Sequence, residues 1–214
     1  GFGGEVQHGL RLVLGQGVPD SKAVFGTLAG LPERFPGRII ETSCSEEAWT
    51  GIAIGMAMTG LRPVVVYQRV EFALLAVEQI VNNAAKVKFL TGKPCPVVFR
   101  MIVGRGWGQG PTHGQSFEGF WASIPGIRVV MPGTPEEAGI LLKNALAGDE
   151  PVVYLEHRWL HGVEAVNWPD TAASQRLASW AGRERDEHSP AIVVAGTDIT
   201  IAAAGWNVQE ALRA

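Results

Sequence analysis

The chain has 214 residues, of which 46% are hydrophobic and 18% charged, and its net charge is −3 at neutral pH. This composition is ordinary for a globular protein that buries a sizeable core. No run of Lys or Arg supports a nucleic-acid surface, and no apolar stretch approaches the roughly 18 residues of a membrane span. We therefore expect neither nucleic acid nor a membrane as a partner.

The first half of the chain predicts short apolar strands that alternate with helices. Residues 10–14 predict a strand, and a short strand at 39–40 leads towards Ser45, a residue typical of a helix N-cap. The helix expected behind it covers residues 46–59 and stops at Gly60, since glycine favours the conformation that ends helices.

The alternation continues through the middle of the chain. Residues 64–67 are nearly all apolar, which is typical of a strand buried on both faces. Apolar residues near helical spacing predict one long helix over 72–89. A strand at 96–101, a glycine-rich loop, a helix at 116–123 and a strand at 127–131 follow.

The next helix carries the clearest local signal. Thr134 is suited to the N-cap, Pro135 to the first helical position, and Glu137 stands three residues after the cap. Gly148 ends this helix, and residues 151–156 predict a last strand. The whole pattern predicts an α/β fold with a mostly parallel sheet flanked by helices.

Three segments divide the chain. Residues 1–160 hold the alternating pattern, and the polar residues 161–189 are interpreted as a linker. Residues 190–214 restart with strands at 191–195 and 199–203 and a helix from residue 206. We interpret this last segment as the truncated start of a second domain.

Two cysteines bear on location. Cys44 and Cys95 match no zinc or redox spacing, and the N-terminal residues contain no charged-then-apolar signal. This low count favours a reducing, cytoplasmic setting, in which we expect both cysteines to be small buried side chains.

Glu46 and His113 are the first candidates for chemistry. Glu46 opens a helix after a strand, where ligands bind in parallel α/β sheets, although acids in a first turn also simply complement the helix dipole. His113 follows the loop Gly104–Gly110, which does not fit the G-x-G-x-x-G phosphate fingerprint. A histidine there is suited to general acid–base work, although a lone loop histidine is commonly only solvated. The spacing of His157 and His161 does not favour a metal site.

Several blocks in a fixed order resemble one family. They are VFGTLAGL, the stretch ETSCSEEAW with GIAIG, FALLAVEQIVNNAAK, PVVFR, IPGIRVVMPGTPEEAG and PVVYLEH. Together they resemble the E1 β subunits of pyruvate, branched-chain 2-oxoacid and acetoin dehydrogenases, over about residues 10–160 and again at 190–214. The resemblance implies a transketolase-like pyrimidine-binding fold that binds thiamine diphosphate.

The resemblance also implies roles for individual residues. Glu46 matches the glutamate that hydrogen-bonds the cofactor's aminopyrimidine ring and so activates its 4′-amino group as a base. Phe72 matches the aromatic residue that stacks on the pyrimidine, and Gln68 is assigned to the same cofactor site. His113 matches a catalytic histidine, although Thr112 and Gly114 replace two of the family's polar neighbours. The backbone of Ala145, Leu146 and Gly148 matches a candidate potassium loop.

The activity implied is oxidative decarboxylation of a 2-oxo acid with acyl transfer to lipoamide. Because no diphosphate motif is present, Mg²⁺ and the diphosphate are expected on an E1 α subunit, in a heterotetramer with a second β subunit that serves a lipoyl acyltransferase E2. Two alternatives stay open: another thiamine enzyme of the transketolase group, and a truncated, non-catalytic α/β interaction module.

Overall fold

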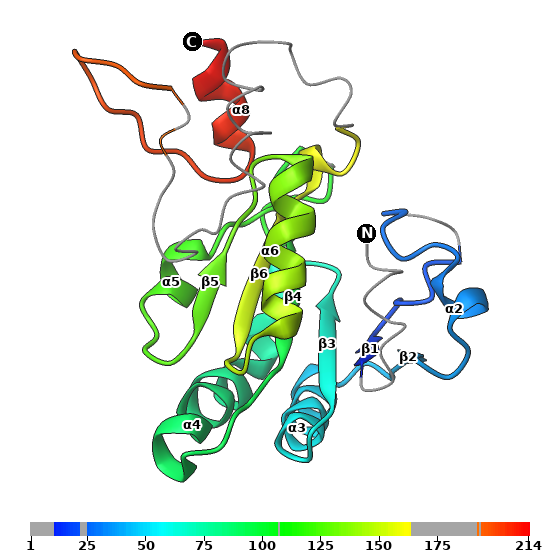
Figure 1. The fold of residues 1–214 in the computed structure, drawn as a ribbon. Coiled ribbons are helices and arrows are strands. Elements are labelled where there is room, and N and C mark those ends of the chain that lie inside the picture. Colours follow the sequence, from blue (N-terminus) through cyan, green and yellow to red (C-terminus); the bar gives the residue numbers. More distant parts are fainter. Residues whose placement is uncertain (1–10, 22–24, 107, 164–191, 193) are drawn as a thin grey trace.

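A computed structural model describes residues 11–21, 25–106, 108–163, 192 and 194–214. Its centre is a six-stranded sheet in the order β2-β1-β3-β4-β6-β5, and every neighbouring pair of strands is parallel (Figure 1). The predicted α/β class is confirmed. The strands are β1 (Arg11–Gly15), β2 (Ile39–Glu41), β3 (Arg62–Tyr67), β4 (Val98–Val103), β5 (Arg128–Val130) and β6 (Val152–His157).

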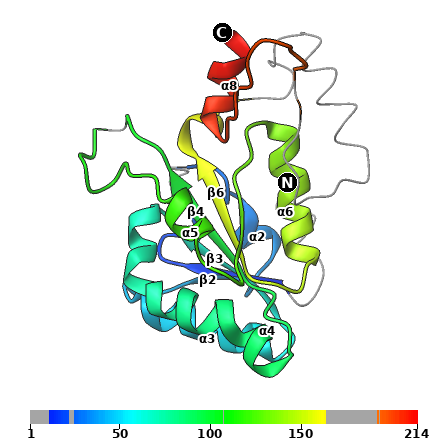
Figure 2. The same ribbon diagram turned by 90° about the vertical axis from the view of Figure 1, so that its left-hand side faces the viewer.

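Helices cover both faces of the sheet (Figure 2). Alternate side chains of β3 enter two separate cores: Val65 and Tyr67 pack on one face, and Val64 and Val66 on the other. One core takes α3 (Glu46–Met58), the 3₁₀ helix η1 (Val70–Ala76), the π helix η2 (Gln79–Ala84), α4 (Ala85–Thr91) and α5 (Glu118–Ala122). The other takes α2 (Leu31–Arg34) and α6 (Pro135–Ala147).

The two predicted helix caps differ in outcome. Thr134 Oγ1 accepts the backbone N–H of Glu137 at 3.1 Å, and a Glu137 carboxylate oxygen accepts the N–H of Gly133 at 3.0 Å, so the start of α6 is confirmed. Ser45 does stand at the N-cap of α3, but its side chain caps nothing. Its ψ of 75° lies outside the extended conformation from which a cap hydroxyl normally reaches the first turn.

The single helix predicted over 72–89 is instead three helical pieces, η1, η2 and α4. The buried residues Ala76, Ile80, Ala84 and Val87 keep an average helical spacing, and the apolar period therefore does not reveal the π turn between them. None of the described helices is long and apolar enough to cross a membrane.

The C-terminal segment is partly as predicted. Helix α8 (Trp206–Arg213) is present, and Gln209 Nε2 donates to the carbonyl of Gly133 at 2.8 Å. The strand predicted at 199–203 is wrong, because these residues join no ladder and Ile199 stays 79% exposed. The predicted linker lies mostly outside the described residues, and the strand at 191–195 partly so.

The burial prediction has different outcomes for the two cysteines. Cys95 is buried as predicted, and burial raises the pKa of its thiol to about 11. Cys44 is exposed, so the prediction for it is wrong, because it lies in the loop between β2 and α3 and outside both cores.

Candidate functional site

A cleft opens at the carboxyl ends of β1, β2 and β3, where ligands bind in parallel α/β sheets. Its volume is about 730 Å³, within the usual range for small-molecule sites. The cleft is lined by Glu41 at the end of β2 and by Gln68, Arg69 and Phe72, which follow β3. Loops before α2 and before α5 close it. The residues that carry the argument below are Phe25, Gln68, Arg69, Phe72, Gln109 and His113.

Three predicted site residues meet on this cleft. The rings of Phe72 and His113 lie edge to face, with centroids 5.6 Å apart and planes at 83°. Gln68 Nε2 donates to the carbonyl of Gly17 at 3.0 Å, which ties the end of β3 to the end of β1. The Thr112 hydroxyl lies 2.9 Å from Nδ1 of His113, so the threonine orients the imidazole ring.

Glu46 is not among the residues that line the cleft. It is the first residue of α3 and only 5% exposed. The hydroxyl of Tyr67, the last residue of β3, pairs with Thr50 Oγ1 at 2.6 Å. Burial raises the pKa of Tyr67, the hydrogen bond with Thr50 opposes this rise, and the negative charge of Glu46 adds to it. Because Thr50 Oγ1 also contacts the carbonyl of Glu46, the first turn of α3 lies against the end of β3, the strand that Gln68 follows.

Arg69 is a site residue that no sequence motif marks. Its Nη1 donates to the carbonyl of Gln68 at 2.6 Å, and its Nε donates to Oε1 of Gln109 at 3.0 Å. The guanidinium also lies over the ring of Phe25, 4.9 Å from the centroid. Burial lowers the pKa of Arg69. The sequence signal that could have identified Arg69 is its position two residues after a strand, because the ligand crevice of such sheets lies at the carboxyl ends of the strands.

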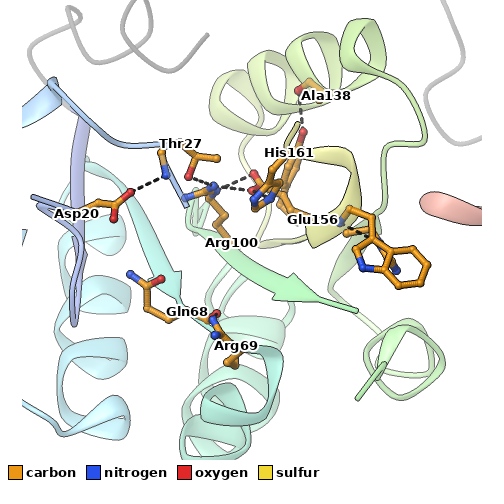
Figure 3. Close-up of polar contacts among 12 residues, drawn as sticks. Asp20, Thr27, Gln68, Arg69, Arg100, Ala138, Glu156 and His161 are labelled. Carbon is orange, nitrogen blue, oxygen red and sulfur yellow. Dashed lines mark hydrogen bonds and ion pairs between the residues drawn. The ribbon is translucent and has the colours of Figure 1, made fainter. Parts of the chain in front are cut away.

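A second polar cluster supports the wall of the cleft (Figure 3). Arg100 Nε donates to Glu156 Oε1 at 2.6 Å and Nη2 donates to Thr27 Oγ1 at 2.6 Å. His161 Nε2 lies 3.2 Å from the other Glu156 oxygen, and its ring meets Phe25 edge-on at 6.2 Å. Burial by itself would raise the pKa of Glu156, but Arg100 and His161 outweigh it and hold that pKa at about 2. His161 thus connects this cluster to Phe25, one of the residues that line the cleft.

The candidate potassium loop is already contacted by a cation of the chain, Arg62 of β3. Arg62 Nη1 donates to the carbonyls of Leu146 at 3.2 Å and Gly148 at 2.5 Å, and Nη2 pairs with Asp149 at 2.9 Å. Two of the three predicted carbonyl ligands are therefore already engaged by a guanidinium. Among the described residues, no cluster of three or more His, Cys, Asp or Glu side chains could hold a metal ion.

A parallel α/β sheet with its cleft at the carboxyl ends of the strands defines a ligand-binding protein of the doubly wound type. The chain belongs to the family described as transketolase, pyrimidine binding domain, which matches residues 2–162. The expected transketolase-like fold is thereby confirmed.

Two relatives define the resemblance more closely. The mitochondrial pyruvate dehydrogenase E1 component subunit beta of Saccharomyces cerevisiae is 35% identical over 207 residues, which cover 94% of this chain and 54% of that protein. The 2-oxoisovalerate dehydrogenase subunit beta of Bacillus subtilis is 40% identical over 149 residues, covering 68% of this chain and 46% of that protein. The chain thus spans about half the length of these relatives.

A solved structure has the same fold. The inactive β4 tetramer of a split-gene transketolase superposes with a TM-score of 0.73 over 99% of this chain and 64% of that chain. Its sequence identity of 20% limits the comparison to the fold.

Proposed function

We propose that the chain is the β-subunit half of a thiamine-diphosphate-dependent 2-oxoacid dehydrogenase, which decarboxylates a 2-oxo acid oxidatively and transfers the acyl group to lipoamide. The observation that carries this proposal is the convergence of Gln68, Phe72 and His113 on one cleft. The identity to E1 β subunits over most of the chain supports the same activity.

The chemistry of these side chains fits the pyrimidine end of the cofactor. Glu46 offers a carboxyl for a ring nitrogen, Phe72 an aromatic face, and Gln68 an amide, beside a cleft of about 730 Å³. When bound, thiamine diphosphate supplies the electron sink that the decarboxylation of a 2-oxo acid requires. Mg²⁺ and the diphosphate are proposed to be held by the partner subunit.

Glu46 is proposed to hold a proton at the ring nitrogen of the pyrimidine. Its near-complete burial limits access of water to the carboxyl group, which would favour proton exchange with the ring of a bound cofactor over exchange with solvent.

His113 is proposed to move protons near the reacting carbonyl of the substrate. Thr112 takes Nδ1, which leaves Nε2 as the nitrogen available to the cleft. Thr112 therefore orients the ring in place of the family's polar neighbour.

The assembly proposed contains an E1 α subunit, a second β subunit and a lipoyl acyltransferase E2. Binding of potassium stays a prediction. Because Arg62 engages the carbonyls of Leu146 and Gly148, we expect a bound ion to be coordinated by other oxygens of the loop. A cytoplasmic location also stays a proposal, since the yeast relative is named as mitochondrial.

The test is Glu46→Gln in the enzyme assembled with its α partner. We expect exchange of the C2 proton of bound thiamine diphosphate, followed by NMR, to slow by at least about a hundredfold, because the amide cannot hold the ring proton. Glu47→Gln is the matched control, since Glu47 is the exposed neighbour in the same helical turn. Unchanged exchange in Glu46→Gln would contradict this role of Glu46. Turnover of a ketose with an aldehyde, but of no 2-oxo acid, would assign the activity to the transketolase group instead.

A further inference from the structure

The loop that carries His113 is bound by a carboxylate of the helix η1. The backbone N–H of Gln115, two residues after the histidine, donates to Oε1 of Glu71 at 2.6 Å. Residues 111–116 form no helix or strand, and Gln115 itself is exposed. A hydrogen bond to an ionised acceptor is roughly twice as strong as a neutral one, so Glu71 is a strong point of attachment for an irregular loop.

The geometry of η1 directs Glu71 towards this loop. The helix buries every third residue, at positions 70, 73 and 76, which is the spacing at which side chains of a 3₁₀ helix share one face. That face packs in the core, so Glu71 and Phe72 lie on the remaining faces and are only partly buried. Phe72 meets the ring of His113 edge to face, and Glu71 binds the backbone just beyond it. Two adjacent residues of η1 therefore contact the histidine and the chain that follows it.

The start and the middle of the same loop are held by other contacts. Gly104 approaches His157 of β6 so closely that a Cβ atom there would lie 2.9 Å from Cε1 of the imidazole. Gln109 Oε1 accepts from Arg69 Nε at 3.0 Å. Burial lowers the pKa of Arg69, and the negative charge of Glu71 opposes that fall. Glu71 thus acts on the loop directly at its end and, through Arg69, in its middle.

We propose that Glu71 is a positioning residue for His113: it binds the loop behind the histidine and so holds the imidazole against Phe72 on the cleft. This inference rests on the proposed function, in which His113 moves protons near the reacting carbonyl, and it adds the group that fixes the histidine in place. Glu71 is not among the residues that line the cleft, so it acts through the loop and not on the substrate.

NMR of the full chain tests the position of the ring without any turnover. Glu71→Leu removes the acceptor, and we expect the amide proton of Gln115 to exchange at least about tenfold faster and the nuclear Overhauser contacts between the rings of Phe72 and His113 to disappear. Glu71→Gln keeps an oxygen acceptor and should retain most of both signals. Gln115→Pro deletes the donor at an exposed position and should also abolish the ring contacts.

The control variant is Glu78→Leu. Glu78 is an exposed acid seven residues further along the same helical stretch, and its carboxylate accepts side-chain amides of η2 at the surface. Its loss should leave the exchange of the Gln115 amide and the contacts between the two rings as in the wild type.

The complex assembled with the α partner gives the kinetic measurement. With pyruvate or 2-oxoisovalerate as substrate, Glu71→Leu should lower kcat by about tenfold or more and change KM by less than about threefold, because a displaced proton donor slows the chemical step while the binding groups stay in place. Glu71→Gln should recover most of the lost kcat, and Glu78→Leu should lose none.

The two measurements separate this role from the activity. If the wild-type complex is active and Glu71→Leu leaves the ring contacts or kcat unchanged, the positioning role is wrong and the proposed function stands. If Glu71→Leu abolishes the ring contacts while the wild-type complex turns over no 2-oxo acid, the proposed function fails and Glu71 still positions His113.

Discussion

At the scale of single residues, the pair of Arg100 and Glu156 shows how a buried charge is retained. The Arg100 side chain is 1% exposed and that of Glu156 is 14% exposed, so each depends on the other for its charge. A folded-state pKa of about 2, against an ordinary 4.5, means that folding favours the carboxylate. The corresponding stability is complete above pH 4.5 and is lost as the pH falls towards 2.

We predict that Glu156→Gln lowers the free energy of unfolding at neutral pH by about 3 kcal/mol, because it leaves the guanidinium of Arg100 buried without its counter-charge. The same variant should lose part of the fall in stability that the wild type shows between pH 4.5 and 2. Urea unfolding over that pH range measures both effects. Asp149→Asn is the control. It removes the charge of an exposed partner of Arg62, and this loss should lower the free energy of unfolding by less than about 1 kcal/mol. Equal losses in the two variants would contradict the argument.

At the scale of elements, helix α6 is stabilised at both ends by different means. Thr134 caps its first turn, a local interaction within four residues. Its last carbonyls, those of Leu146 and Gly148 among them, accept from Arg62, the first residue of β3. A cation at a helix C-terminus also interacts favourably with the helix dipole, so Arg62 connects α6 to the centre of the sheet.

We predict that Arg62→Met destabilises the chain by about 1–2 kcal/mol, because several carbonyl bonds and a charge at the helix end are lost together. Thermal or urea unfolding measures the loss. Arg213→Met removes only an exposed pair with Glu210 in α8 and should have little effect. An Arg62→Met variant as stable as Arg213→Met would show that α6 does not depend on this contact.

At the scale of the whole molecule, residues of one chain line the cleft, but the helices α3, η1 and α4 leave part of the protein's apolar surface uncovered. Large apolar side chains stand exposed on α3, η1 and α4, with Phe89 at 90% and Leu75 at 61%. Such a group of apolar residues is typical of a protein interface. The proposed E1 α subunit is expected to complete the site.

We predict that the isolated chain binds thiamine diphosphate with Mg²⁺ only weakly, and that adding the α partner produces tight binding and a larger assembly. Calorimetry measures the affinity and light scattering the mass. Tight, Mg²⁺-dependent binding by the chain alone would contradict a site divided between two subunits.

Much of the architecture was determined by the sequence itself. Apolar runs bounded by glycine and polar residues predicted the strands of the sheet, and Thr134, Pro135 and Glu137 predicted the start of α6. These features depend on neighbours within a few residues, so local hydrogen bonding and the period of burial carry them. The family resemblance added Gln68, Phe72 and His113, which meet on one cleft.

Only the tertiary structure decided the contacts on which the proposals rest. Arg69 and Gln109 are 40 positions apart, Arg100 and Glu156 are 56 apart, and Arg62 lies 86 positions from Gly148. Residues 199–203 illustrate the same limit, because an apolar run becomes a strand only where a neighbouring strand accepts its hydrogen bonds. Strand order and register bring distant side chains together, and no pattern of neighbouring residues specifies that arrangement.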